Sequence, residues 1–121
     1  MPGLIRRTLL IGGAAAAASG LALWRWRTPG ASDLPYGSDP RQVMDVSYPR
    51  GTSPAPILVM VHGGAFRMGD KADLAIWPEV LEAGIAVVRV NYRLSTSAKW
   101  PAQGEDLLAS IVHLQREGAG L

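Results

Sequence analysis

A histidine followed by two glycines, His62-Gly63-Gly64, comes directly after an apolar run at residues 57–61. Glycine has no Cβ to block a close approach, so the backbone N–H groups of such a loop can point at a ligand oxygen. In a site sheltered from water, two or three fixed N–H donors stabilise the negative charge that develops on a carbonyl oxygen during acyl transfer. Losing one donor typically costs about 2.7–4 kcal/mol. The segment therefore predicts a loop whose backbone holds a developing oxyanion.

The elements that must position this loop alternate between strand and helix patterns. Strands are expected at residues 42–48, 57–61 and 85–90. The first alternates like an outer strand, and the other two are continuous apolar runs typical of strands buried on both faces. Helices are expected from Asp73 to about residue 83 and from Pro101 to residue 118. This order predicts an α/β layer with parallel central strands, whose ligands bind beyond the carboxyl ends of the strands.

Helical periodicity assigns a buried face to the final helix. The inward residues are expected to be Leu107, Leu108, Ile111, Val112 and Leu114. His113 shares its face with Asp106 and Ser110, and the pattern predicts a solvated surface there. Trp77 is expected in the core and Trp100 against the loop before the last helix, although either ring could instead line a substrate cleft.

The first 30 residues are typical of a targeting segment. Arg6-Arg7 precedes an apolar run from Leu9 to Leu23, and the pair resembles a bacterial twin-arginine export signal. The run is shorter than the roughly 20 residues that span a bilayer, but it suits a signal peptide. No clean small-residue cleavage site follows, so residues 1–30 are expected to be a hydrophobic signal helix or a membrane anchor. An alanine-rich leader without an export role is the alternative.

This leader predicts contact with the export machinery or the membrane. The location is then periplasmic, extracellular or at the bacterial inner membrane. The Gly-, Pro- and Ser-rich residues 31–41 are expected to be a linker, and residues 42–121 the α/β domain.

Composition excludes several other functions. The chain has 12 basic and 10 acidic residues, and four arginines within the first 30 residues account for its positive balance. A nucleic-acid partner is therefore not expected. There is no cysteine, and Asp70 and Asp73 with His62 show no recognised ligand spacing, so neither a metal nor a cofactor is predicted. Residues 64–71 nearly match a phosphate-binding loop, but Asp70 intervenes, and a solvated turn pair of Asp70 and Lys71 is favoured.

Two strings together suggest a family. HGGAFRMGDK at residues 62–71 and VRVNYRLS at residues 88–95 resemble the N-terminal part of the α/β-hydrolase fold. The similarity is greatest to the esterase and lipase branch with an HGGG-type loop, especially bacterial feruloyl-esterase-like and arylformamidase-like proteins. It covers roughly residues 36–118. It implies the first strands of a mostly parallel sheet with two flanking helices, and a small-molecule ester as substrate.

The resemblance also implies roles for individual residues. The oxyanion hole would be formed by the backbone N–H groups of Gly63, Gly64 and Ala65. Supporting residues of the loop would be His62, Asn91, Tyr92, Arg93 and Asp106, with Asp106 paired to Arg93. Ala65 stands where many relatives have a third glycine, and Phe66 replaces a tryptophan. Neither change removes a backbone donor, and Phe66 is expected to influence the shape of substrate accepted.

The catalytic triad is not found in this chain. These hydrolases carry their nucleophile in G-x-S-x-G on a strand-to-helix turn, and the motif does not occur here. The nearest string surrounds Ser53, which precedes a strand. We therefore expect a fragment of a carboxylic-ester hydrolase, inactive alone, with the oxyanion loop and without nucleophile, acid or base. The alternative is a non-catalytic hydrolase remnant that is attached to the membrane or depends on a partner.

Overall fold

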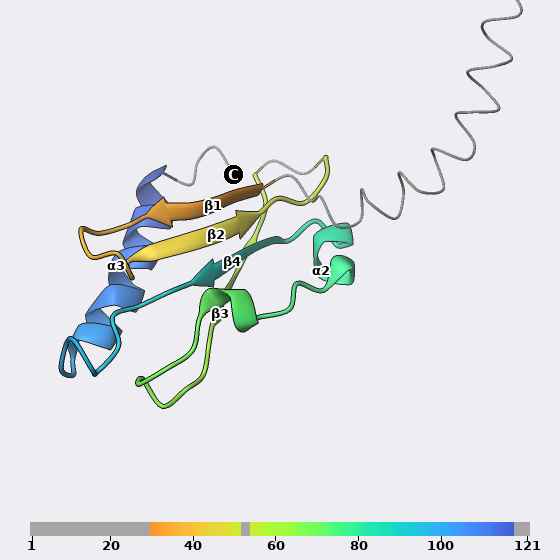
Figure 1. Ribbon diagram of the computed structural model, residues 1–121. Helices are drawn as coiled ribbons and strands as arrows, with labels where there is room; N and C mark the ends of the chain where they lie inside the picture. The colour runs from red at the N-terminus through yellow and green to blue at the C-terminus, as the bar shows by residue number, and fades with distance from the viewer. Residues whose placement is uncertain (1–29, 52–53, 118–121) are drawn as a thin grey trace, which may run out of the picture.

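The computed structural model describes residues 30–51 and 54–117. They form a four-stranded sheet in the order β1-β2-β4-β3 (Figure 1). The strands are β1 (Gly30–Pro35), β2 (Val43–Ser47), β3 (Ile57–Val61) and β4 (Ala86–Val90). The helices are the 3-10 turn η1 (Lys71–Asp73), α2 (Pro78–Glu82) and α3 (Ala102–Glu117). The predicted α/β class is confirmed, but in the described residues the sheet is mixed, because only β3 and β4 run parallel.

One face of the sheet packs against α3. Met44 and Val46 of β2 lie opposite Val90 and Val88 of β4. Side chains two apart in a strand share a face, so these four residues form one apolar surface. Leu114 of α3 completes the buried cluster. This core fixes β4 at the centre of the domain, where its carboxyl end reaches the predicted loop.

The opposite face carries a group of charges, of which Asp45 and Lys71 are buried. Asp45 and Arg89 are opposite each other in β2 and β4, and Arg89 Nη2 lies 3.0 Å from Asp45 Oδ2. Lys71 Nζ lies 2.8 Å from Asp45 Oδ1 and 2.9 Å from Asp33 Oδ1. Burial opposes the charge of Lys71, but the two carboxylates outweigh it and raise its pKa. The prediction of a solvated Lys71 was therefore wrong: its side chain is buried.

Strand β1 forms where a linker was expected. It pairs with β2 through a register shift between Ala31 and Leu34, so β2 is an inner strand and not an outer one. β3 also differs from the prediction of burial on both faces, because Ile57 and Leu58 are 37% and 38% exposed. Among the described residues, β3 has a paired neighbour only on its β4 side, which explains the exposure.

The helix expected from Asp73 is replaced by η1 and α2. Asp70, not Asp73, is the N-cap of η1, and Asp73 completes the capping box. Pro78 occupies the first turn of α2, and proline disfavours a helical conformation in the residue before it. Trp77 is accordingly extended and 59% exposed, so its predicted place in the core was wrong.

Helix α3 agrees with the prediction in extent and only partly in its buried face: Leu114 is in the core and Leu107 packs against it, as expected. Its buried residues are Ala102, Gln103, Asp106, Ser110 and Leu114. Leu108 and Ile111 are 63% and 43% exposed, and His113 is half-buried. Gln103 and Asp106 are inside because other segments supply their hydrogen-bond partners, which periodicity alone does not reveal. Ser110 instead donates to the Leu107 carbonyl within the helix.

The leader prediction falls on residues outside the described part of the chain, apart from residue 30. Within residues 30–51 and 54–117, no helix has the length and apolar character needed to cross a membrane.

Candidate functional site

The predicted loop follows β3 at the edge of the sheet where β4 also ends. Val61 and Val90 are register partners in these parallel strands, so the chain leaves both strands at neighbouring points. His62 to Phe66 therefore lies beside Asn91 to Arg93, as the sequence pattern led us to expect.

Unusual backbone angles shape this loop. Gly64 has φ of 118°, and Ala65 and Phe66 have φ of 53° and 63°. A Cβ on Gly64 would lie 2.0 Å from the carbonyl oxygen of Met68, so only glycine fits this position. A left-handed conformation costs a non-glycine residue about 1–2 kcal/mol. The hydrogen bond from the Ser95 amide to the Phe66 carbonyl, at 2.7 Å, helps to hold Phe66 in this conformation.

Hydrogen bonds within the loop fix the directions of the Gly63 and Gly64 carbonyl groups. Gly63 O lies 2.7 Å from His62 Nδ1, and Gly64 O accepts from the amides of Arg67 (3.0 Å) and Met68 (3.2 Å). These peptides are trans, so the N–H of the following residue points away from each held carbonyl. Within the described residues, the amides of Gly64 and Ala65 have no hydrogen-bond acceptor. Both are therefore available to a ligand.

His62 lies beneath the loop. It is 4% exposed, and its ring stacks on Tyr92 with centroids 4.5 Å apart. The Tyr92 hydroxyl donates to the His62 carbonyl at 3.0 Å, and burial raises the pKa of this tyrosine. The position fits a bracing role for His62.

Gly69 provides the space for the bond between His62 and Gly63. A Cβ on Gly69 would lie 2.5 Å from both Gly63 O and His62 Nδ1. With φ of 104°, the residue also has a conformation that L side chains rarely adopt. The turn before η1 is therefore fitted to the loop after β3.

Asn91 joins the same turn to the end of β4. Its Oδ1 accepts from the Lys71 amide at 2.8 Å, and its Nδ2 donates to Asp70 Oδ2 at 2.9 Å. The Ala72 amide, together with Asn91 and Arg41, holds the pKa of Asp70 below its usual value. Asp70 therefore acts here as an ionised acceptor at the centre of the turn.

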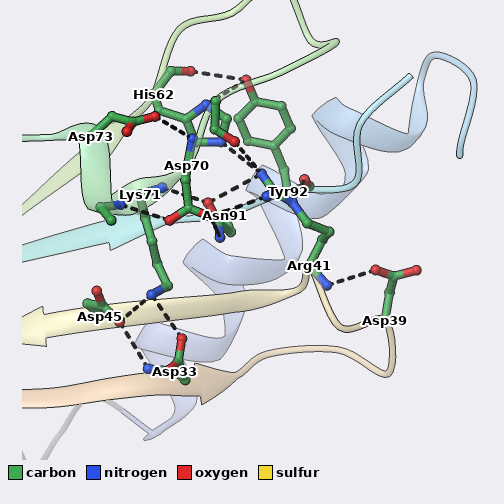
Figure 2. Close-up of polar contacts among 12 residues, drawn as sticks. Asp33, Asp39, Arg41, Asp45, His62, Asp70, Lys71, Asp73, Asn91 and Tyr92 are labelled. Atoms are coloured by element: carbon green, nitrogen blue, oxygen red, sulfur yellow. Dashed lines mark hydrogen bonds and ion pairs between the residues drawn. The ribbon is translucent and has the colours of Figure 1, made fainter. Parts of the chain in front are cut away.

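Arg41 is the supporting residue that the sequence analysis missed. Figure 2 shows its guanidinium among the loop residues. Its contacts are Gly69 O (2.9 Å), Tyr92 O (3.2 Å), Asp70 Oδ2 (3.2 Å), His62 Nε2 (3.3 Å) and Asn91 Oδ1 (3.4 Å). No motif contains Arg41, and only its position beside a Pro-containing turn marks it. The Asp39 carboxylate fixes that turn by accepting from the Arg41 amide at 2.8 Å.

Arg93 and Asp106 pair as expected. Arg93 Nη2 lies 2.6 Å from Asp106 Oδ1, and the Arg93 amide donates to Asp106 Oδ2 at 2.8 Å. Gln42 Nε2 also donates to Asp106, at 2.8 Å. Burial alone would raise the pKa of Asp106, but these hydrogen bonds outweigh it and hold the pKa below its usual value. The pair ties the end of β4 to α3.

Two aromatic rings lie next to the loop. Phe66 is 46% exposed and Trp100 is 68% exposed, with ring centroids 6.0 Å apart. Phe66 also meets Tyr92 edge to face at 6.0 Å. Trp100 is therefore near the predicted site, as the alternative reading of this residue allowed.

Among the residues that the structure describes, no group of three or more His, Asp or Glu side chains could hold a metal ion.

Comparison with known proteins gives consistent relatives. The BD-FAE family matches residues 44–121. Esterase LipC of Mycobacterium tuberculosis is 32% identical over 80 residues, which is 63% of this chain and 20% of that protein. The chain therefore spans about a fifth of the length of this curated relative.

Solved structures agree in fold. The bifunctional GH43-CE protein of Bacteroides eggerthii is 28% identical with a TM-score of 0.67, over 75% of this chain and 12% of that one. Esterase B of Lactobacillus rhamnosis is 25% identical with a TM-score of 0.64, over 96% of this chain and 41% of that one.

Proposed function

Because the chain belongs to the BD-FAE family of the α/β-hydrolase fold, we propose that it supplies the oxyanion loop of a carboxylic-ester hydrolase. The observation that carries the proposal is that the Gly64 and Ala65 N–H groups have no hydrogen-bond acceptor among the described residues. The direction of each N–H is fixed by the hydrogen-bonded carbonyl of the preceding residue. Gly63 contributes the first glycine of the loop, and His62 braces it from below.

In the proposed reaction, a nucleophile attacks the ester carbonyl and its oxygen becomes negatively charged. The amides of Gly63, Gly64 and Ala65 donate to that oxygen and stabilise the tetrahedral intermediate. The donors are already oriented before substrate binds, so little reorganisation is needed in the transition state. Asn91, Tyr92, Arg93 and Asp106 keep the neighbouring loop in place.

The proposal assigns nucleophile, acid and base to residues outside this sequence. G-x-S-x-G does not occur in the 121 residues, and the chain spans only 20% of Esterase LipC. The chain alone is accordingly expected to be inactive. Its substrate is proposed to be a small-molecule ester, in keeping with the esterases that it resembles, and Phe66 is proposed to contact it.

A second candidate is a non-catalytic product that depends on a partner or on the membrane. The exposed apolar side chains of Leu58 and Leu108 favour it, because a partner would cover them. Independently, we propose that residues 1–30 direct export to the periplasm or exterior, or anchor the chain to the inner membrane. Mass measurement of the product from bacterial cells would show whether this leader is removed.

The test uses the complete reading frame that contains these residues and a short-chain aryl ester. Gly64→Pro removes one proposed donor and also changes the loop backbone, because proline cannot adopt the positive φ of Gly64, so activity is expected to fall by at least about 10²–10³-fold. Arg116→Gln, on the exposed end of α3, is the control and should retain activity. Equal activity in Gly64→Pro and wild type would show that the loop has another role. If the purified 121-residue chain hydrolysed esters strongly and serine reagents inhibited this activity, the proposal that the nucleophile lies outside these residues would be overturned.

A further inference from the structure

We propose that Arg41 is a positioning residue that fixes the tautomer of His62. Both ring nitrogens of His62 have close polar neighbours: Nε2 lies 3.3 Å from Arg41 Nη2, and Nδ1 lies 2.7 Å from Gly63 O (Figure 2). The Tyr92 hydroxyl is farther away, 3.5 Å from Nδ1, and it donates its proton to the His62 carbonyl at 3.0 Å. His62 is buried, so these neighbours, and not solvent, decide where its proton lies.

The chemistry of the two neighbours leaves one arrangement. A guanidinium can only donate hydrogen bonds, so Nε2 must present its lone pair. A carbonyl oxygen can only accept, so Nδ1 must carry the proton. A doubly protonated ring would point its Nε2–H at the Arg41 guanidinium and would place the positive imidazolium beside the positive guanidinium. The neutral ring of His62 therefore carries its proton on Nδ1.

Arg41 is suited to this role because its own position is fixed. The same Nη2 donates to Gly69 O at 2.9 Å, Nη1 to Asp70 at 3.2 Å, and Nε to Tyr92 O at 3.2 Å. These bonds occupy separate edges of a planar group, which prevents rotation away from His62. A flexible lysine ammonium could satisfy only some of them.

The tautomer determines the direction of the Gly63–Gly64 peptide. With the proton on Nδ1, His62 donates to Gly63 O, and the Gly64 N–H points to the opposite side. The other tautomer would set a nitrogen lone pair against the Gly63 carbonyl and an N–H against Arg41, so both contacts would be lost together. The tautomer assignment stands on this geometry, while its importance for catalysis rests on the proposed oxyanion role.

Nitrogen NMR measures the tautomer directly. The 121-residue chain is labelled with ¹⁵N-histidine, and correlations between ring protons and nitrogens are recorded at mildly alkaline pH, where imidazole is neutral. The chain has two histidines, so His113 on α3 is an internal reference. In the wild type, we expect the protonated signal of His62 at Nδ1. In Arg41→Met, a fraction of the signal should shift to Nε2, because only the Gly63 carbonyl then favours the proton on Nδ1. In Arg41→Lys the shifted fraction should be smaller, and in the control Arg116→Gln no shift is expected.

Two results would overturn the inference. One is a wild-type His62 with its proton on Nε2, which is informative even if Arg41→Met fails to fold. The other is an unchanged Nδ1 proton in folded Arg41→Met, or in Arg41→Lys if only that variant folds. The esterase test is separate: full activity in Gly64→Pro would remove the oxyanion role and leave the tautomer result intact.

Discussion

The imidazole of His62 and the phenol ring of Tyr92 stack with an interplanar angle of 11° and centroids 4.5 Å apart. His62 follows β3 and Tyr92 follows β4, so the contact joins the loops at the ends of two parallel strands. Because the Tyr92 hydroxyl also donates to the His62 carbonyl, the stack has both an apolar and a polar component.

Substitution of Tyr92 separates these two components. Tyr92→Phe keeps the ring and removes the hydrogen bond, and it should lower the free energy of unfolding by about 1–2 kcal/mol. Tyr92→Ala removes the stack as well and should cost about 3–5 kcal/mol. Urea unfolding of the 121-residue chain measures both. Equal losses in the two variants would contradict a contribution from ring stacking.

Gly63 and Gly64 form a matched pair for the shape of the loop. Gly64→Ala should destabilise the chain, because its Cβ would lie 2.0 Å from Met68 O at a positive φ. Gly63→Ala should have a much smaller effect on stability, since a Cβ there meets nothing within 4 Å among the described residues. Thermal unfolding compares them. Equal melting temperatures would show that the loop has a different backbone.

Removal of the Asp106 carboxylate should loosen the attachment of α3 to the end of β4. Asp106→Ala leaves Arg93 and Gln42 without their acceptor, and a loss of about 2–3 kcal/mol in unfolding free energy is expected. Glu105→Ala removes the exposed neighbouring carboxylate and should cost less than about 1 kcal/mol. Urea titration of both variants tests the difference, and comparable losses would argue against a specific role for Asp106.

Acid should weaken the fold through two carboxylates. The pKa values of Asp70 and Asp106 are lower in the folded chain than the ordinary value of 3.8. Their contribution to stability is therefore fully present above the unfolded pKa and is lost as the pH falls through the folded pKa. Unfolding free energy should decline below about pH 4.

Variants show which carboxylate is responsible for the acid response. Asp106→Asn should flatten the decline in stability at low pH, because asparagine does not titrate, whereas Glu105→Gln should preserve it. Urea unfolding at a series of pH values gives the slopes. The same acid slope in Asp106→Asn and the wild type would contradict the lowered pKa of Asp106.

Phe66 should affect substrate preference more than the chemical step. In the complete reading frame, Phe66→Ala should raise KM for an aryl ester, since an aromatic contact is worth about 0.5–1.5 kcal/mol, or roughly 2- to 12-fold. The value of kcat should change less. Trp77→Ala is the control, because this exposed ring lies before α2. If the ratio of KM for an aryl ester to KM for an alkyl ester were the same in wild type and Phe66→Ala, contact between Phe66 and the aromatic group of the substrate would be excluded.

Strands and helices with strong apolar patterns were predictable from sequence. The expected strand at residues 57–61 matches β3, and those at 42–48 and 85–90 contain β2 and β4. β1 was missed because GASDLP has little strand propensity. It forms in pairing with β2, where the Asp33 amide donates to Asp45 at 2.9 Å, and a contact between distant segments leaves no local pattern.

The motif residues of the site could be recognised, but not the residue that links them. The parallel strands bring His62 and Asn91 to neighbouring positions, which alternation and order along the chain already implied. Arg41 contacts groups 21 to 51 residues away in sequence, so no spacing rule points to it. Lys71 was likewise misjudged, because its carboxylate partners come from β1 and β2.

The lack of a side chain at Gly69 also limits how this sequence can change. The Cβ of any side chain there would clash with both the His62 ring and the Gly63 carbonyl. A mutational route that replaces Gly69 must therefore displace the histidine first or at the same time. Positions 62 and 69 are expected to vary jointly among relatives, although the two residues are not adjacent in the chain.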